Sequence, residues 1–551
     1  MSRRGVTGKP TSTLCAMDTP DLAGAKIAVG AAQGVVDAAV AHLAALDLDE
    51  HQVVAYDVAH AAAAVDTARQ MLAYGELGDI EAALACAYIA DTVHDLATKL
   101  IGRHPAWGLE REVLDDCIDF VAVHRDPEFV ASLANRPGDR HLGDDFEMVQ
   151  DMFRSFAEKE VAPRAEHVHR TNADVPEEII SGLSEVGGFG LSVPVEYGGF
   201  SEGGPSEYLG MVVATEELSR ASLGIGGSLI TRPEILTRAL VKGGTEEQKQ
   251  EWLPKIAAGE ILNAVAVTEP DYGSDVAGVT VAAVPKEGGW VINGVKTWCT
   301  FAARADVLMV LARTNPDRSM GHRGLSIFIV PKPRGDGHGF EFTQDAGADG
   351  GAPGGGKMAG RAIDTIGYRG MHSYEVAFEE WWVPGTHLIG GDDGQGRGFY
   401  FQMEGFENGR LQTAARAVGV MQAAYEAAAE YAENRVVFGS AISEYQLTEA
   451  KLGRMAFLIQ AARQSMYHCA KLMGAGEGAL EASMVKAYVC KAAEWVTREA
   501  LQIHGGMGYA EEYVVSRLFV DARVLSIFEG ADETLALKVI IRRLIAQSET
   551  A

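Results

Sequence analysis

Apolar residues recur every three to four positions over much of this chain, which is the spacing of amphipathic helices. Ile89, Val93, Leu96 and Leu100 show this spacing within an alanine-rich stretch that runs from Asp21 to Asn135. The pattern predicts four or five helices in this stretch and no strand.

A second helical block is expected from about Asp144 to Gly259, and its glycine-rich residues 187–204 predict a long loop. Beyond Ile261 the spacing changes, and short runs with β-branched residues alternate with turn residues, which is typical of a β-domain. We expect strands at these positions: Ala264–Val267, Trp290–Ile292, Val307–Leu311, Ser326–Val330 and Glu375–Phe378.

Long amphipathic helices are expected again after Gly396, so the chain is predicted to be α+β and mainly helical. The glycine-rich tract from Asp345 to Gly360 is expected to be a flexible loop. At about 150 residues per domain the length suits three to four domains. The pattern divides the chain into an extra N-terminal helical domain, a second helical domain, a β-domain and a C-terminal helical domain. Their expected ranges are 1–140, 141–262, 263–394 and 395–551.

The charge balance is strongly acidic, with 76 Asp and Glu against 48 Lys and Arg and a net charge of −28. Such an excess argues against a nucleic-acid partner and against docking on an anionic membrane. The most apolar long stretch, Ile27 to Leu46, is interrupted by Gln33, Asp37 and His42. We therefore expect a buried helix there rather than a membrane span.

Six cysteines are scattered through the chain without a C-x-x-C pair. A large chain with few cysteines is typical of reduced thiols in the cytoplasm. We expect a cytoplasmic protein without a metal site.

Two segments of the expected β-domain carry residues suited to a flat ligand. "VTEPDYGSD", residues 267–275, follows an apolar run and places Thr268 and Ser274 on a turn. "KTWCTF", residues 296–301, sets Trp298 near a threonine hydroxyl, a pairing suited to stacking on a ring and hydrogen-bonding its edge. Taken one by one, these segments could equally be an ordinary turn, and a core position is the simpler interpretation of Trp298.

Two further segments, in the C-terminal helices, could meet a pyrophosphate. In "RVVFG", residues 435–439, the arginine can pair with phosphate oxygens, while Phe438 can pack on an adenine or in the core. In "LQIHGGMGY", residues 501–509, the glycines allow a backbone to approach a phosphate closely. A surface arginine and a plain turn between helices remain the alternatives.

A fifth segment, "FEGADET" at residues 528–534, places Glu529 in mostly apolar surroundings. Desolvation raises the pKa of a carboxyl group, which makes it a usable general base near neutral pH. The alternative is an exposed glutamate that begins a helix.

Taken together, the types, order and spacing of the five segments resemble the acyl-CoA dehydrogenase flavoprotein family, from about residue 145 to 545. The resemblance implies a helical domain, a β-barrel-like middle domain and a C-terminal four-helix bundle, with the extra helices in front. It also implies FAD as the cofactor, an acyl-CoA as the substrate and an electron-transfer flavoprotein as the acceptor. A homodimer or homotetramer is expected.

The same resemblance implies roles for single residues. Glu529 would be the catalytic base, and Ser274 would face coenzyme A. The FAD contacts would be Val267, Thr268, Trp298, Cys299 and Thr300 at the ring, and Arg435, Phe438, Gln446, Gln502, Gly505 and Gly506 at the pyrophosphate and adenine.

The chain departs from the family pattern at two positions. Ala531 stands where the family has a threonine, so one hydroxyl contact to FAD is missing. Some relatives carry the base in the first C-terminal helix, and the matching residue here is Gly409, which cannot serve. Glu407 is near enough to remain a rival to Glu529.

Segments 359–371 and 406–419, together with "FEGADE", resemble the methylsuccinyl-CoA dehydrogenase branch. That branch implies oxidation of (2S)-methylsuccinyl-CoA to mesaconyl-CoA in the ethylmalonyl-CoA pathway. Because this substrate has a free carboxylate, the acyl pocket should hold a cation. Arg232 is the first candidate, Arg369 the second, and Arg410 a further one.

Other interpretations remain open. The enzyme could act on isobutyryl-, isovaleryl- or glutaryl-CoA, or it could be an acyl-CoA oxidase. From another class, it could be a flavin-binding interaction protein without catalysis, which Glu529 and the complete set of flavin segments argue against.

Overall fold

The computed structural model describes residues 19–204 and 206–550. Five α-helices form the first block, which confirms the predicted number, and no strand occurs among its described residues. They are α1 (Leu22–Ala44), α2 (Gln52–Gly75), α3 (Asp79–Leu100), α4 (Ile118–His124) and α5 (Pro127–Ala131).

Helix α1 is the one helix in the described part of the chain that is long and apolar enough to cross a membrane. Its buried side chains recur at a spacing of three to four residues, including Ala25, Ala32, Val36 and Leu43. That face packs against α2 and α3, as the predicted buried helix would.

The second helical block begins at α6 and surrounds the loop predicted at residues 187–204. Short 3-10 turns, and no longer element, occupy that loop. Thr245 and Gln248 form a capping box at the start of α11, satisfying backbone N–H groups that the helix leaves free. The helices are α6 (Asp144–Phe156), α7 (Ala162–Thr171), α8 (Glu177–Glu185), α9 (Glu207–Ala221), α10 (Glu234–Gly243) and α11 (Glu246–Ala257).

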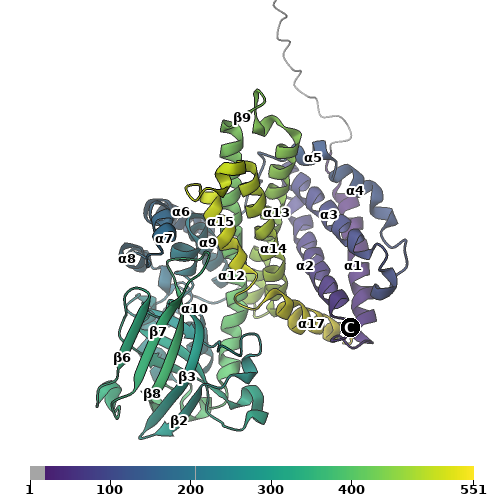
Figure 1. The fold of residues 1–551 in the computed structure, drawn as a ribbon. Helices are drawn as coiled ribbons and strands as arrows, with labels where there is room; N and C mark the ends of the chain where they lie inside the picture. Colours follow the sequence, from purple (N-terminus) through teal and green to yellow (C-terminus); the bar gives the residue numbers. More distant parts are fainter. Residues whose placement is uncertain (1–18, 205, 551) are drawn as a thin grey trace, which may run out of the picture.

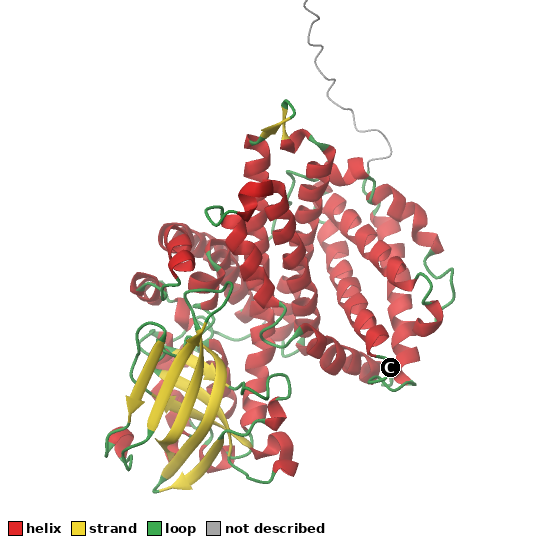
Figure 2. Ribbon diagram, in the orientation of Figure 1, coloured by secondary structure: helices red, strands yellow, loops and turns green. Residues whose placement is uncertain are grey.

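A curled eight-stranded sheet follows, in the order β1-β4-β2-β3-β8-β7-β6 with β5 paired to β4 (Figure 2). All five predicted runs overlap a strand, and only Val267 lies one residue beyond its strand. The strands are β1 (Asn263–Ala266), β2 (Ala282–Lys286), β3 (Gly289–Thr300), β4 (Val307–Arg313), β5 (Leu325–Pro331), β6 (Gly339–Thr343), β7 (Lys357–Ile363) and β8 (Ser373–Pro384).

The sequence pattern missed β2, β6 and β7. All three expose much of their length, so they lack the apolar runs that marked the buried strands. The prediction of a loop for residues 345–360 was wrong at its end, because Lys357–Gly360 pairs with both β6 and β8.

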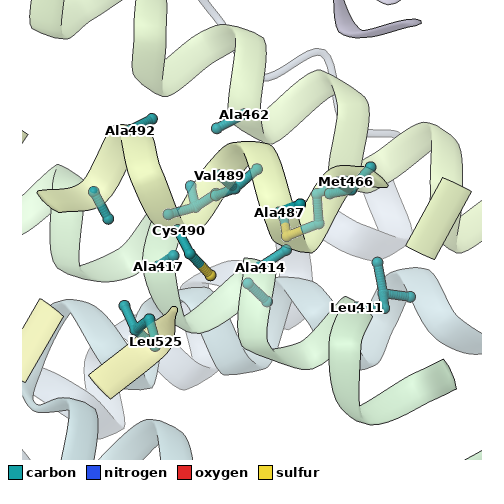
Figure 3. Packing of buried hydrophobic residues seen from close by; sticks show 14 of the residues in the cluster. Leu411, Ala414, Ala417, Ala462, Met466, Ala487, Val489, Cys490, Ala492 and Leu525 are labelled. Carbon is teal, nitrogen blue, oxygen red and sulfur yellow. The ribbon is translucent and has the colours of Figure 1, made fainter. Parts of the chain in front are cut away.

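The C-terminal part is a bundle of α12 (Gly398–Asn434), α13 (Gln446–Gly474), α14 (Ala479–His504) and α15 (Val514–Leu525), followed by the short α16 (Asp532–Thr534) and α17 (Ile541–Ser548). Small side chains such as Ala414, Ala417 and Ala487 let α12 and α14 approach closely (Figure 3). The hairpin of β9 (Val436–Val437) and β10 (Ser440–Ala441) joins α12 to α13.

The N-terminal helices pack on the C-terminal bundle, away from the sheet (Figure 1). Helix α5 comes so close to α13 that a Cβ atom on Gly453 would lie 1.9 Å from the carbonyl oxygen of Val130. An ion pair from Arg454 to Asp91, at 2.9 Å, joins α13 to α3. The extra helices therefore extend the core of the bundle.

Candidate active site

Glu529 lies in the short connection between α15 and α16. Its backbone is left-handed, with φ of 53°, and the next residue, Gly530, has φ of 97°. Because a left-handed conformation costs a non-glycine residue roughly 1–2 kcal/mol, the surrounding contacts must hold Glu529 in place.

The Glu529 carboxylate stands over the bare backbone of α12 at Gly409. A Cβ atom on Gly409 would lie 2.8 Å from Oε2 of Glu529. The position where some relatives carry the base is therefore empty of side chain, and the Glu529 carboxylate reaches toward it. The rival Glu407 instead forms an ion pair with Arg543 of α17, at 3.1 Å.

Sequence reasoning missed Arg416, which lies two helical turns from Gly409 on the same face of α12. Its side chain is fully buried, and its Nη1 has no hydrogen-bond partner among the described residues. The guanidinium carbon lies 5.0 Å from the ring centre of Phe528, next to Glu529. A single charged residue in the run "LQTAARAVG" was the available signal.

Arg416 lies near one of the predicted arginines, Arg232, and near Glu529. Burial lowers the pKa of the Arg416 guanidinium, and the positive charge of Arg232 lowers it further. The Tyr368 hydroxyl and the Glu529 carboxylate act in the opposite direction and raise that pKa. The Tyr368 ring also packs edge-on against Phe528, at 5.5 Å, and its hydroxyl has no partner among the described residues. Polar groups without partners thus converge beside Glu529.

The three predicted arginines differ in how far their guanidinium groups are engaged. Nε of Arg232 donates to the carbonyl oxygen of Ser228, at 2.9 Å. Nη1 of Arg410 donates to the hydroxyl of Ser483, at 3.1 Å, and its Nε has no partner in the described part of the chain. Arg369 donates to two backbone carbonyl groups, which leaves it the least free of the three.

The predicted flavin-ring residues lie together where β1 ends beside β3. The backbone N–H of Thr297 donates to the carbonyl oxygen of Thr268, at 2.8 Å, and Nζ of Lys296 donates to that of Val267, at 2.8 Å. Trp298 lies in an irregularity of the β3–β8 pairing with φ of 57°, and the residue is 54% exposed. An exposed indole held by a bulge can stack on a planar group.

The neighbours of Trp298 complete this edge of the site. The thiol of Cys299 is buried, and the Thr300 hydroxyl lies 3.0 Å from that of Ser373. Ser274, predicted to face coenzyme A, accepts a hydrogen bond at 2.9 Å from Thr534 of α16. The loop of Ser274 therefore meets the segment that carries Glu529.

The other predicted FAD contacts lie at the far end of the bundle. Arg435 follows the last residue of α12, and Phe438, in the β9–β10 hairpin, is 98% exposed with φ of 54°. Gln446 begins α13, and Gln502, Gly505 and Gly506 lie at the end of α14. The ring stacking of Tyr431 on His504, at 4.2 Å, ties the ends of α12 and α14 together. Nothing stands within 4 Å of a Cβ atom on Gly505 or Gly506, so their backbone is open to a ligand.

The two groups of FAD residues lie at opposite ends of one folded chain, since the sheet and the β9–β10 hairpin are far apart in Figure 1. Arg435, just after α12, is 26 residues beyond Gly409, which is about 39 Å along the helix at 1.5 Å per residue. Each group nevertheless suits part of a flavin dinucleotide. Hydroxyl groups and an exposed indole fit a ring, and an arginine with open glycine backbone fits a pyrophosphate.

A helical domain, a curled sheet and a helical bundle with a carboxylate at their junction are the arrangement expected of a flavin-dependent dehydrogenase. Family models match three consecutive parts of the chain: the acyl-CoA dehydrogenase N-terminal domain at residues 143–260, the middle domain at 264–381 and the C-terminal domain at 396–545. The chain belongs to the acyl-CoA dehydrogenase family and is an oxidoreductase that acts on acyl-CoA with a flavin cofactor.

Among its relatives is the (2S)-methylsuccinyl-CoA dehydrogenase of Cereibacter sphaeroides, 40% identical over 528 residues, which cover 90% of this chain and 91% of the relative. That alignment is too long to fit behind residue 143, so it includes residues of the N-terminal helices. The butyryl-CoA dehydrogenase structure from Megasphaera elsdenii, at 29% identity and a TM-score of 0.65, covers 74% of this chain and 100% of its own. A solved structure named for the electron transferring flavoprotein of Acidaminococcus fermentans has 31% identity and a TM-score of 0.63, and the match covers 75% of this chain and 99% of that one.

Proposed function

We propose that this enzyme uses FAD to oxidise (2S)-methylsuccinyl-CoA to mesaconyl-CoA. The observation that carries the proposal is Arg416, a fully buried guanidinium whose Nη1 has no partner in the described part of the chain, on the face of α12 that the Glu529 carboxylate covers. The relative named for this activity supports the same substrate.

A buried arginine without an acidic partner is costly, since an uncompensated buried charge costs about 3–5 kcal/mol. A pocket for a plain alkyl chain would gain nothing from it. A free carboxylate on the acyl group would pair with Arg416, and Arg232 beside it would add to the positive field. A short dicarboxylic acyl-CoA therefore fits the site better than a butyryl or isovaleryl group.

The chain's own groups would divide the chemistry as follows. Glu529 removes the α-proton, and its backbone N–H donates to the thioester carbonyl, stabilising the developing enolate charge. The arginines fix the distal carboxylate, so the α-carbon is oriented toward Glu529. Bound FAD supplies the acceptor for the β-hydride.

The FAD site is proposed to be shared between two copies of the chain. The ring would lie against Trp298 and Thr300 of one copy, while Arg435 and Phe438 of another would hold the pyrophosphate and adenine. The distance of about 39 Å along α12 from Gly409 to Arg435 and the nearly complete exposure of Phe438 support this arrangement. An electron-transfer flavoprotein is the proposed acceptor, in line with the flavoprotein for which one similar structure is named.

Anaerobic bleaching of the flavin tests the substrate. We expect methylsuccinyl-CoA to bleach it faster than butyryl-, isobutyryl-, isovaleryl- or glutaryl-CoA, with little peroxide formed in air. Arg416→Met should raise KM for methylsuccinyl-CoA about tenfold to a hundredfold, the value of a charge-assisted hydrogen bond, without raising it for butyryl-CoA. Arg164→Met, which breaks a surface pair with Glu160, is the matched control. If butyryl-CoA bleached the flavin faster than methylsuccinyl-CoA, the proposed substrate would be wrong.

Mixing variants tests the shared cofactor site. Trp298→Ala and Arg435→Ala should each lose FAD when purified alone. Mixed oligomers of the two would contain sites with both side chains intact, so FAD binding should return in part. Absence of any recovery in verified mixed oligomers would place both residues in one copy's site.

A further inference from the structure

The loop that carries Glu529, residues 526–532, is fixed by hydrogen bonds at its two ends and near its middle. The backbone N–H of Asp532 donates to the carbonyl oxygen of Ser526, at 3.1 Å, which closes the loop on itself. Nζ of Lys486, buried in α14, donates to the carbonyl oxygen of Gly530, at 2.6 Å. These contacts hold the two consecutive left-handed residues, Glu529 and Gly530.

A third anchor comes from the N-terminal helices. The Asp532 side chain, only 10% exposed, accepts hydrogen bonds from the Tyr56 hydroxyl and from Nε2 of His60, the latter at 3.2 Å. Both residues lie on α2, more than 470 positions away in the chain. Lys491 of α14 completes the cluster with an ion pair to Asp532, at 3.2 Å.

The charge on Asp532 makes this anchor strong. Burial raises the pKa of the Asp532 carboxyl, but the hydrogen bonds from His60 and Tyr56 and the charge of Lys491 outweigh it, so the pKa lies well below the usual value. The group is therefore ionised at neutral pH and accepts charge-assisted hydrogen bonds, which are about twice as strong as neutral ones. Ala531 alone separates this anchor from the two left-handed residues.

We infer that Tyr56 and His60 are positioning residues that hold Asp532 and thereby aim the Glu529 carboxylate at the substrate. The inference rests on the role proposed above for Glu529. It gives the N-terminal helices a part in catalysis, since a strained residue stays in place only where its surroundings over-determine it. Lys538, which pairs with Asp49 ahead of α2, provides a second link that does not touch the loop and serves as a comparison.

Hydrogen exchange of the holoenzyme tests the positioning without any substrate. In Tyr56→Phe/His60→Ala, amide exchange of a peptide covering residues 526–534 should accelerate about tenfold or more, as expected when a local anchor is lost. His60→Gln keeps a hydrogen-bond donor for Asp532. Amide exchange of the same peptide in this variant should be slower than in His60→Ala and faster than in wild type. Asp49→Asn should leave this peptide unchanged. Equal exchange in the double variant and in Asp49→Asn would overturn the inference.

Reductive half-reaction kinetics test the catalytic consequence. The double variant should reduce its flavin about ten- to a hundredfold more slowly, the cost of misplacing a reacting group by up to 1 Å. KM should stay near the wild-type value, and the α-deuterium isotope effect should rise as proton removal becomes limiting. A change in KM alone would overturn the inference. If the double variant does not fold, Tyr56→Phe alone, which removes one oxygen, decides by the same measurements.

The two proposals fail in different ways. If no acyl-CoA bleaches the wild-type flavin, the proposed function is wrong, while the exchange of residues 526–534 still shows whether α2 holds the loop. If wild type is bleached and the double variant is bleached equally fast, the positioning is wrong and the proposed function stands.

Discussion

Replacing Gly409 with alanine should slow proton removal without harming the fold. The new Cβ atom would lie 2.8 Å from Oε2 of Glu529, whereas ordinary contact begins at 3.4 Å, so the carboxylate must retreat by about 0.6 Å. A displacement of 1 Å can cost 10²-fold, so we expect a loss of about tenfold, or about 1.4 kcal/mol of activation free energy. The free energy of unfolding should rise slightly, because alanine in a helix interior is favoured over glycine by roughly 0.5–1 kcal/mol.

The assay is anaerobic stopped-flow reduction of the flavin, with and without deuterium at the substrate α-carbon, beside the thermal midpoint of each variant. We expect slower reduction, a larger isotope effect and a midpoint at or above that of wild type. Gly34→Ala is the matched control, because Gly34 also lies in a helix and nothing stands within 4 Å of its Cβ position. Wild-type reduction rates in Gly409→Ala would show that the Glu529 carboxylate does not act from this position.

Further outcomes follow from the same geometry. Glu529→Gln should retain FAD but reduce the flavin of the order of 10² to 10⁴-fold more slowly, the usual value of a general base; wild-type bleaching would exclude Glu529 as the base. Arg416→Met should raise the thermal midpoint of the enzyme without substrate, because it removes a buried charge that has no acidic partner; a lower midpoint would mean that the charge is compensated. Asp532 has a lowered pKa, so its ionised form stabilises the fold above the ordinary value of 3.8, and that contribution is lost as the pH falls through the lower folded value. The gap in thermal midpoint between wild type and Asp532→Asn should therefore be widest near neutral pH and narrow below pH 3.8, and a gap that widens in acid would contradict the assigned sign.

The sequence made much of the fold predictable because helices and buried strands leave a local period. Five of the eight strands of the main sheet were marked by apolar runs, and β2, β6 and β7 were missed because strands with many exposed residues leave no such run. Glu529, Trp298 and Arg435 could be singled out because a carboxylate, an indole and a guanidinium stand in recognisable local segments. Their roles remain predictions.

By itself, the sequence determined the order of helical and β-domains and the short segments that resemble a flavoprotein family, because these features depend on residues close together in the chain. Only the tertiary structure placed Glu529 over Gly409, buried Arg416 with its Nη1 unpartnered among the described residues, and joined Tyr56 to Asp532 across 476 positions. Contacts between distant residues follow from how the helices pack, and packing of that kind leaves no periodic trace in a single sequence.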